Sequence, residues 1–121
     1  MTILEKISDC EIYLNKLIAD SIIEREQFKH HKGSDDVFGC EYNVYDKFVE
    51  RFTYIKKTYE DVFRKEYNYE DYFSLRQYIV NQEKKYHKYF ANSTWGTSCS
   101  KCFEVRYACE IRNLLFTLRR K

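Results

Sequence analysis

Apolar residues recur along this chain at steps of three and four positions, the spacing of one face of a helix. The first run extends from Ile3 to about Phe28. Thr2 followed by Glu5 forms a capping-box sequence in front of it. The predicted buried face comprises Ile3, Ile7, Cys10, Leu14, Leu17, Ile18 and Ile22. The following stretch, HHKGSDDVFG, contains glycine, serine and aspartate, so we expect a turn there.

A second run predicts a helix that starts between Cys40 and Tyr42. Its predicted buried face comprises Tyr45, Phe48, Phe52, Ile55, Tyr59 and Val62. Asn68 is a suitable N-cap for a third helix. Glu70 and Asp71 then lie in the first turn, where the helix dipole favours acids. The third predicted buried face comprises Tyr72, Leu75, Ile79, Gln82, Tyr86 and Tyr89.

The last run predicts a fourth helix that starts around Ser98 to Ser100. Its predicted buried face comprises Val105, Cys109, Leu115 and Leu118. No segment alternates apolar and polar residues long enough to predict a strand. Four helices joined by three short connections predict an all-α fold, an antiparallel four-helix bundle, with an open helical array as the alternative. We expect residues 1–121 to form a single helical domain.

Composition and charge narrow the function classes. The chain has 21 Lys and Arg residues against 19 Asp and Glu residues, a net charge of +2 at pH 7. This balance does not fit a dedicated polyanion binder or an acidic mimic of DNA. The N-terminus has no basic segment followed by an apolar run, and no stretch approaches the roughly 20 apolar residues of a membrane span. We therefore expect a cytoplasmic protein without a membrane partner, whose cysteines bind metal or lie buried.

Every histidine and three of the five cysteines are predicted to gather at one end of the bundle. In an up-down-up-down arrangement, the end of the first helix, the start of the second, the end of the third and the start of the fourth meet at one pole. The residues at these points are His30, His31, Cys40, His87, Cys99 and Cys102. Thiolates with an imidazole are typical ligands of structural Zn²⁺, and C-x-x-C spacing directs two sulfurs at one ion. We therefore predict a structural zinc site with the ligands Cys40, Cys99, Cys102 and His31.

Some choices at this predicted site stay open. The candidates for the fourth ligand, in order of preference, are His31, His30, His87 and Asp36. Inert thiols are an alternative to zinc, whereas a redox C-x-x-C pair needs a βαβ context that this chain lacks. Cys10 and Cys109 lie on the predicted apolar faces, and we interpret both as buried small hydrophobic residues.

We find no spacing of acids and histidines that indicates catalysis. The segment RNLLFTL, which begins at Arg112, resembles the Arg-Asn-x-x-x-x-His motif of the HEPN ribonucleases, which are small helical bundles. Leu118 occupies the position of the histidine, so the imidazole that would transfer the proton is missing. We therefore expect no enzymatic activity.

The segment EYNYEDYF is predicted to expose aromatic surface beside carboxylates, because its closely spaced tyrosines cannot all face inwards. Tyrosines surrounded by acids are suitable anchors for a basic partner protein. The predicted partner-binding residues are Glu66, Tyr67, Tyr69, Glu70 and Asp71. The segment NQEKKYHKYF interleaves lysines with tyrosines, as nucleic-acid-binding surfaces do, but acidic neighbours such as Glu83 dilute its charge. We do not expect direct nucleic-acid binding.

The whole chain is short, rich in Tyr, Lys and Glu, and free of proline, and it resembles small phage and mobile-element proteins of low-GC Gram-positive bacteria. Among these it is similar to the type II-A anti-CRISPR proteins, and Cys40, Cys99 and Cys102 suggest the metal-containing kind. The resemblance implies a protein–protein inhibitor that binds the Cas9 nuclease and blocks its DNA targeting, with Zn²⁺ holding the fold. The alternative class is a zinc-stapled nucleic-acid-binding regulatory module.

Overall fold

The computed structural model describes residues 2–66, 68–91 and 99–119, with the side chains of residues 90–91 and 99–102 outside that description. Over these residues the chain is helical and contains no strand, which confirms the predicted all-α class. The elements are α1 (Ile3–Gln27), the 3₁₀ turn η1 (Lys29–His31), α2 (Val37–Thr58), α3 (Glu60–Phe63), α4 (Tyr69–Ala91) and α5 (Cys99–Arg119). None of the helices in the described part is apolar over a length that would cross a bilayer.

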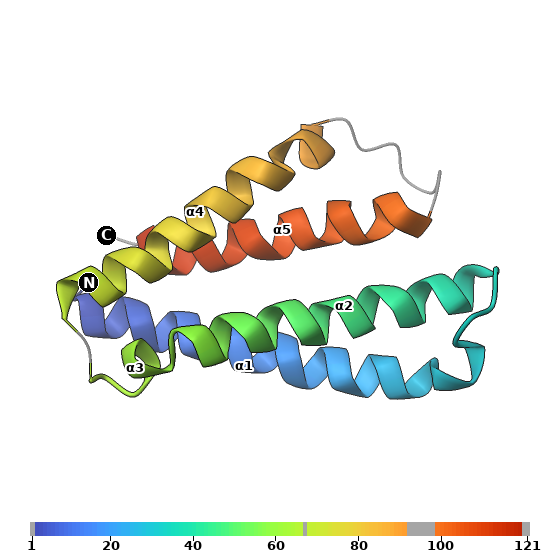
Figure 1. Cartoon of the computed structure of the whole chain (residues 1–121), viewed down its shortest axis with the longest axis horizontal. Helices are drawn as coiled ribbons and strands as arrows, with labels where there is room; N and C mark the ends of the chain where they lie inside the picture. The colour runs from blue at the N-terminus through green and yellow to red at the C-terminus, as the bar shows by residue number, and fades with distance from the viewer. Residues whose placement is uncertain (1, 67, 92–98, 120–121) are drawn as a thin grey trace.

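The four long helices lie side by side and alternate in direction (Figure 1). Helix α1 pairs with α2 and α4 pairs with α5, while α5 also packs against α1 and α2 and so joins the two pairs. The connection between α1 and α2 lies towards the same end as the first turn of α5, on the right of Figure 1. The start of α1, the short α3 and the start of α4 lie at the opposite end.

Two helix starts follow the capping predictions. At α1, the Thr2 hydroxyl accepts a hydrogen bond from the Glu5 backbone N–H at 3.1 Å, and a Glu5 carboxylate oxygen accepts one from the Thr2 N–H at 3.4 Å. At α4, the Asn68 side chain accepts from the Asp71 N–H at 2.9 Å, and the Asp71 carboxylate accepts from the Asn68 N–H at 3.2 Å. Both caps are made within four residues, so a local sequence pattern is enough to specify them.

Helix α2 differs from its prediction at both ends. It begins at Val37, earlier than expected, because the Asp36 carboxylate caps it by accepting a hydrogen bond from the Gly39 N–H at 2.9 Å. It ends at Thr58, and the predicted continuation through Val62 is instead the separate short helix α3. Val62 is nonetheless buried. The apolar pattern therefore predicted its burial correctly, although it did not predict where the helix ends.

Aromatic side chains from three helices form the centre of the core. Tyr107 of α5 is fully buried, with its ring centroid 5.6 Å from Phe52 of α2, 4.8 Å from Tyr86 of α4 and 5.2 Å from Phe103. Its hydroxyl donates a hydrogen bond to the Gln82 side chain at 3.0 Å, which satisfies the one polar atom of the ring. This cluster joins the α1–α2 pair to the α4–α5 pair.

The predicted buried faces of α5 and α1 need correction. Val105 and Cys109 are half-buried, although Leu115 and Leu118 are buried as expected. The residues that fill the core from α5 are Phe103, Tyr107, Ala108, Ile111, Leu114, Leu115 and Leu118. Ile22 of α1 is exposed. Both errors have the same cause, since a helix with apolar residues around much of its circumference offers more than one face, and its neighbours decide which is buried.

Candidate functional site

The elements that carry the predicted zinc ligands lie at one end of the molecule. His31 closes the turn η1, Cys40 lies in the first turn of α2, and α5 begins at Cys99 (Figure 1). Cys40 is buried, and the half-buried His31 ring has its centroid 4.8 Å from that of Phe38. The alternating helix directions therefore bring these backbone segments to the same end of the molecule, as predicted.

The described side chains do not by themselves form a metal site. Among them, no three His, Cys, Asp or Glu residues are grouped as metal ligands. The candidates included in that statement are His30, His31, Asp36, Cys40 and His87. The side chains of Cys99 and Cys102 lie outside the described part, so the zinc prediction depends on these two thiols and stays a prediction. His87 contacts Glu83, one turn earlier on α4, with 3.1 Å between Nδ1 and Oε1.

The other two cysteines differ from each other. Cys10 is fully buried, as predicted, and desolvation raises the pKa of its thiol to about 12, although a hydrogen bond with Thr117 opposes this effect. Such a thiol is inert at neutral pH. Cys109 was also predicted to be buried, but it is half-buried because its side of α5 borders a surface groove and not the core.

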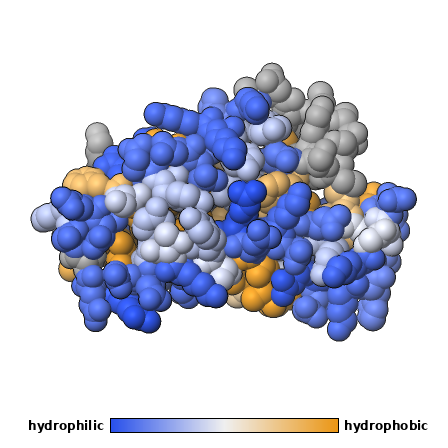
Figure 2. Space-filling model, in the orientation of Figure 1, coloured by the Kyte–Doolittle hydropathy of each residue, from blue (hydrophilic) through white to orange (hydrophobic). Residues whose placement is uncertain are grey.

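The predicted partner-binding segment forms an apolar patch with an acidic border. Tyr69 is 67% exposed and Phe73, one turn later on α4, is 51% exposed. Leu4 of α1, 50% exposed, lines a cavity of about 460 Å³ together with Tyr69 and the cap residue Asn68. Figure 2 shows hydrophobic surface at this end of the molecule, over the first turns of α4. We call Leu4, Tyr69 and Phe73 the α1–α4 patch.

Acidic residues border the α1–α4 patch, although they are not equivalent. Glu66 and Glu70 are exposed, whereas Asp71 is half-buried and engaged in the cap of α4. Tyr67 lies outside the described residues. Tyr72 points inwards: it is 2% exposed, and its hydroxyl donates a hydrogen bond to the Leu118 carbonyl at 3.3 Å. The expectation that the tyrosines of this segment divide between core and surface is therefore confirmed for Tyr69 and Tyr72.

A larger cavity, of about 680 Å³, lies between α1, α2 and α5, where the sequence pattern predicts no site. We call it the α1–α5 groove. Its lining residues are Leu17, Asp20, Ser21, Ile23, Glu24, Tyr45, Phe48, Arg106, Cys109 and Glu110. A sequence signal existed, because Arg106, Cys109 and Glu110 follow each other at steps of three and one on the same side of α5. An arginine on a helix is usually solvated, so this pattern did not identify a groove.

Arg106 is held firmly on the α2 side of the groove. Its guanidinium donates hydrogen bonds to both carboxylate oxygens of Glu41, at 3.0 and 3.2 Å, and to the Tyr45 hydroxyl at 2.7 Å. The guanidinium carbon also lies 4.8 Å from the Tyr45 ring centroid. Burial lowers the pKa of Arg106, but the Glu41 and Tyr45 contacts outweigh this effect and leave the pKa raised. Arg106 is therefore a permanent cation whose charge Glu41 neutralises.

Glu110 is held on the α1 side of the groove. Tyr13 of α1 donates a hydrogen bond to the Glu110 carboxylate at 2.6 Å, and Asn113 donates to the Tyr13 hydroxyl at 2.9 Å. Desolvation, followed by the bond to Glu110, raises the pKa of Tyr13 to about 12. The hydroxyl therefore stays protonated and keeps donating to Glu110 at physiological pH.

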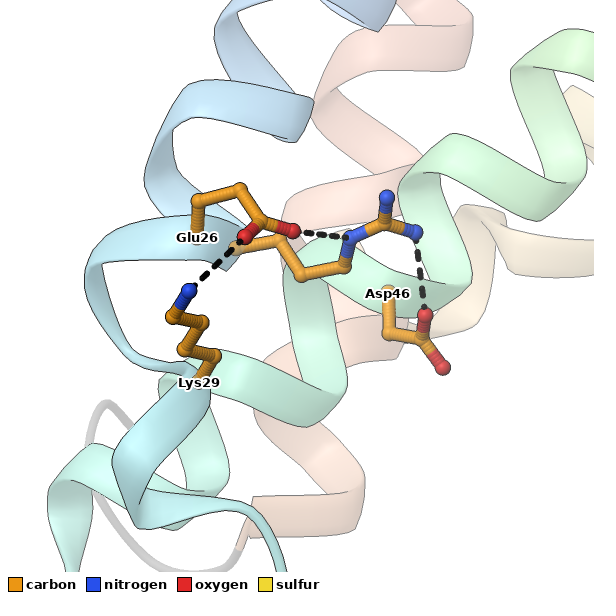
Figure 3. A network of polar contacts seen from close by, with 4 residues as sticks. Glu26, Lys29 and Asp46 are labelled. Atoms are coloured by element: carbon orange, nitrogen blue, oxygen red, sulfur yellow. Dashed lines mark hydrogen bonds and ion pairs between the residues drawn. The ribbon is translucent and has the colours of Figure 1, made fainter.

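A network of ion pairs joins the last turn of α1 to α2. Arg25 contacts Asp46 of α2 at 3.3 Å and Glu26 at 3.9 Å, and Glu26 contacts Lys29 at 3.7 Å (Figure 3). Glu26, Lys29 and Asp46 are all more than half exposed, so each pair contributes at most about 1 kcal/mol. We interpret this network as a clasp between α1 and α2 and not as a site of chemistry.

Three features therefore compete as the functional site: the predicted zinc ligands, the α1–α4 patch and the α1–α5 groove. Comparisons with protein-family models, with curated proteins and with solved structures found no match to this chain.

Proposed function

We propose that this chain is a non-enzymatic protein–protein inhibitor that binds the Cas9 nuclease through the α1–α4 patch and blocks its DNA targeting. The observation that carries the proposal is the exposure of Leu4 and Tyr69 at one cavity, with the exposed Phe73 one turn further along α4. Single exposed apolar residues need no explanation, but several grouped at a hollow and bordered by charge are typical of an interaction site.

The charges around the patch favour a basic partner. Glu66 and Glu70 border it, and both are exposed. A nuclease that holds a guide–target heteroduplex has a positively charged channel, and a surface with carboxylates around aromatic anchors complements such a channel. An inhibitor of this kind competes with nucleic acid by occupying the channel and needs no chemistry of its own.

A binding assay with charge and aromatic variants tests this function. The wild-type protein is expected to co-elute with purified type II-A Cas9 near one-to-one stoichiometry and to suppress its DNA cleavage. Tyr69→Ala combined with Glu66→Gln and Glu70→Gln should weaken binding by about a hundredfold, because an aromatic anchor and two charges are lost. Glu50→Gln, an exposed acid on α2, is the matched control and should bind normally. Absence of any complex with Cas9 would refute the proposed partner.

We further propose that Zn²⁺ holds the end of the molecule opposite the patch, with Cys40, Cys99, Cys102 and one histidine, His31, as ligands. The proposal is supported by the buried Cys40 in the first turn of α2 and by the position of the α5 start at the same end. The metal would supply a tetrahedral crosslink between the α1–α2 connection and α5, and no catalytic function.

Metal analysis tests the zinc site independently of Cas9. Elemental analysis of the purified protein is expected to give about one Zn²⁺ per chain. Cys99→Ser and Cys102→Ser should each lower the zinc content and the melting temperature together, whereas Cys109→Ser should lower neither by a comparable amount. Less than about a tenth of an equivalent of Zn²⁺ in the wild type would refute the site.

One observation favours the second candidate, a nucleic-acid-binding regulatory module. A cavity of about 360 Å³ between α4 and α5 is lined by His87, Arg112 and Arg119, next to Phe116, which is 62% exposed. Cations beside an exposed ring match the combination of phosphate contact and base stacking used on single strands. Fluorescence anisotropy with labelled single-stranded and duplex DNA discriminates the candidates: a regulator binds with a steep salt dependence, whereas the proposed inhibitor does not bind.

A further inference from the structure

We propose that the α1–α5 groove is a binding site for an arginine side chain of a partner protein. The groove has an apolar floor and carboxylates on both walls. A guanidinium on a flexible aliphatic stem combines the two properties that such a site selects, because the stem is apolar and the head is a planar cation with five N–H donors.

The floor suits the aliphatic part of the side chain. Phe48 of α2 is buried and Leu17 of α1 is half-buried, and both line the cavity of about 680 Å³. Methylene groups placed against these residues would be removed from water while the charged head stays near the rim. An acidic or small polar side chain would gain nothing from this surface.

The walls carry negative charge that the protein does not neutralise. Asp20 and Glu24 are four residues apart on α1 and so lie on the same face of that helix, while Glu110 faces them from α5. No cation of the described residues lies within ion-pair distance of these three carboxylates. The groove therefore attracts a cation. Carboxylates on its two walls can accept hydrogen bonds from N–H groups on different sides of one guanidinium.

Arg106 does not cancel this charge, although it lines the same cavity. Glu41 accepts two hydrogen bonds from Arg106, and the guanidinium stacks on Tyr45. These contacts hold Arg106 against α2 and neutralise it there, outside the group formed by Asp20, Glu24 and Glu110. The same contacts keep the α2 side of the groove in place for a ligand.

Ser21 also lines the groove and is only 3% exposed. A guanidinium N–H that reaches past the carboxylates would donate a hydrogen bond to its hydroxyl oxygen.

This inference goes beyond the proposed function and does not depend on it. The groove uses the second half of α1 and the middle of α2 and α5, whereas the α1–α4 patch lies at the other end of the molecule. A failure to bind Cas9 would therefore leave the arginine site untouched, and the reverse also holds.

Titration of the full chain with a pair of capped peptides tests the site. The probe is Ala-Ala-Arg-Ala-Ala with blocked ends, and its control replaces arginine by citrulline, which has nearly the same shape but no charge. Amide NMR spectra are expected to show saturable shifts at residues of the α1–α5 groove with the arginine peptide. The citrulline peptide should bind at least about tenfold more weakly, the factor typical of a lost charge-assisted hydrogen bond.

Variants of the chain locate the effect. Asp20→Asn combined with Glu24→Gln should weaken the arginine peptide by about tenfold or more while leaving the weak citrulline binding unchanged. Glu50→Gln, an exposed acid outside the groove, should bind as the wild type does. Three results with the wild-type chain would each overturn the proposal. They are equal affinity for the two peptides, shifts confined to other surfaces, and no shift up to about 10 mM peptide.

Discussion

The buried thiol of Cys10 allows a quantitative test of the packing between α1 and α5. Cys10 is fully buried, and desolvation of the thiolate raises its pKa from 9.0 to about 12, more than the hydrogen bond with Thr117 lowers it. The folded protein therefore keeps this thiol protonated over a pH range in which the unfolded chain ionises it. Stability must then depend on pH in that range.

The sign and size of the effect follow from these two pKa values. The contribution of Cys10 to stability is fully present below pH 9, the unfolded value, and is lost as the pH rises towards the folded value of about 12. Within this window the free energy of unfolding falls by about 1.4 kcal/mol per pH unit, so Cys10 alone accounts for a loss of about 2 kcal/mol at about pH 10.5.

Urea unfolding at pH 7 and at about pH 10.5, under reducing conditions, measures this loss. Cys10→Ala should lower the free energy of unfolding by about 1–2 kcal/mol at pH 7, because packing is lost. Between pH 7 and about pH 10.5 the variant should lose about 2 kcal/mol less than the wild type, so the two proteins should be about equally stable at the higher pH. Buried tyrosines such as Tyr107 titrate alike in both proteins and cancel. Cys109→Ala, at a half-buried position, is the matched control and should keep most of the wild-type pH dependence. An alkaline loss in Cys10→Ala equal to that of the wild type would refute the reasoning.

Three further predictions concern stability and can be measured by denaturant unfolding. Phe52→Ala should cost about 3–5 kcal/mol, because Phe52 is fully buried against Tyr107, whereas Tyr54→Ala at a 53% exposed position should cost less than about 1 kcal/mol; similar losses would contradict the described core. Arg106→Gln should cost about 1–2 kcal/mol by leaving Glu41 without its paired hydrogen bonds, and a double-mutant cycle with Glu41→Gln that shows simple additivity would exclude this coupling. Thr2→Ala should cost about 1 kcal/mol and speed amide exchange in the first turn of α1, and unchanged exchange would show that the capping box is not formed in solution.

Local features of the chain were sufficient to predict the four long helices and most of the buried positions. The capping pairs Thr2–Glu5 and Asn68–Asp71 act within a single turn, and the apolar repeats place residues such as Leu14 and Ile79 in the core. The division of the tyrosines of EYNYEDYF between core and surface was also predictable, because a helix has only one inner face. These features depend on spacing along the chain, so one sequence is enough to read them.

Packing between helices decided the rest. The chain has no glycine or proline at the break after Thr58, and it has buried apolar residues both before and after the break. The apolar pattern alone therefore does not distinguish this break from a continuous helix. Likewise, Arg106 pairs with Glu41, 65 positions earlier, and Tyr13 pairs with Glu110, 97 positions later. The α1–α5 groove arises from such contacts, because it exists only where α5 leaves part of α1 and α2 uncovered. Spacing along the chain determines which way a residue faces on its own helix, but only the arrangement of the neighbouring helices determines what it meets there.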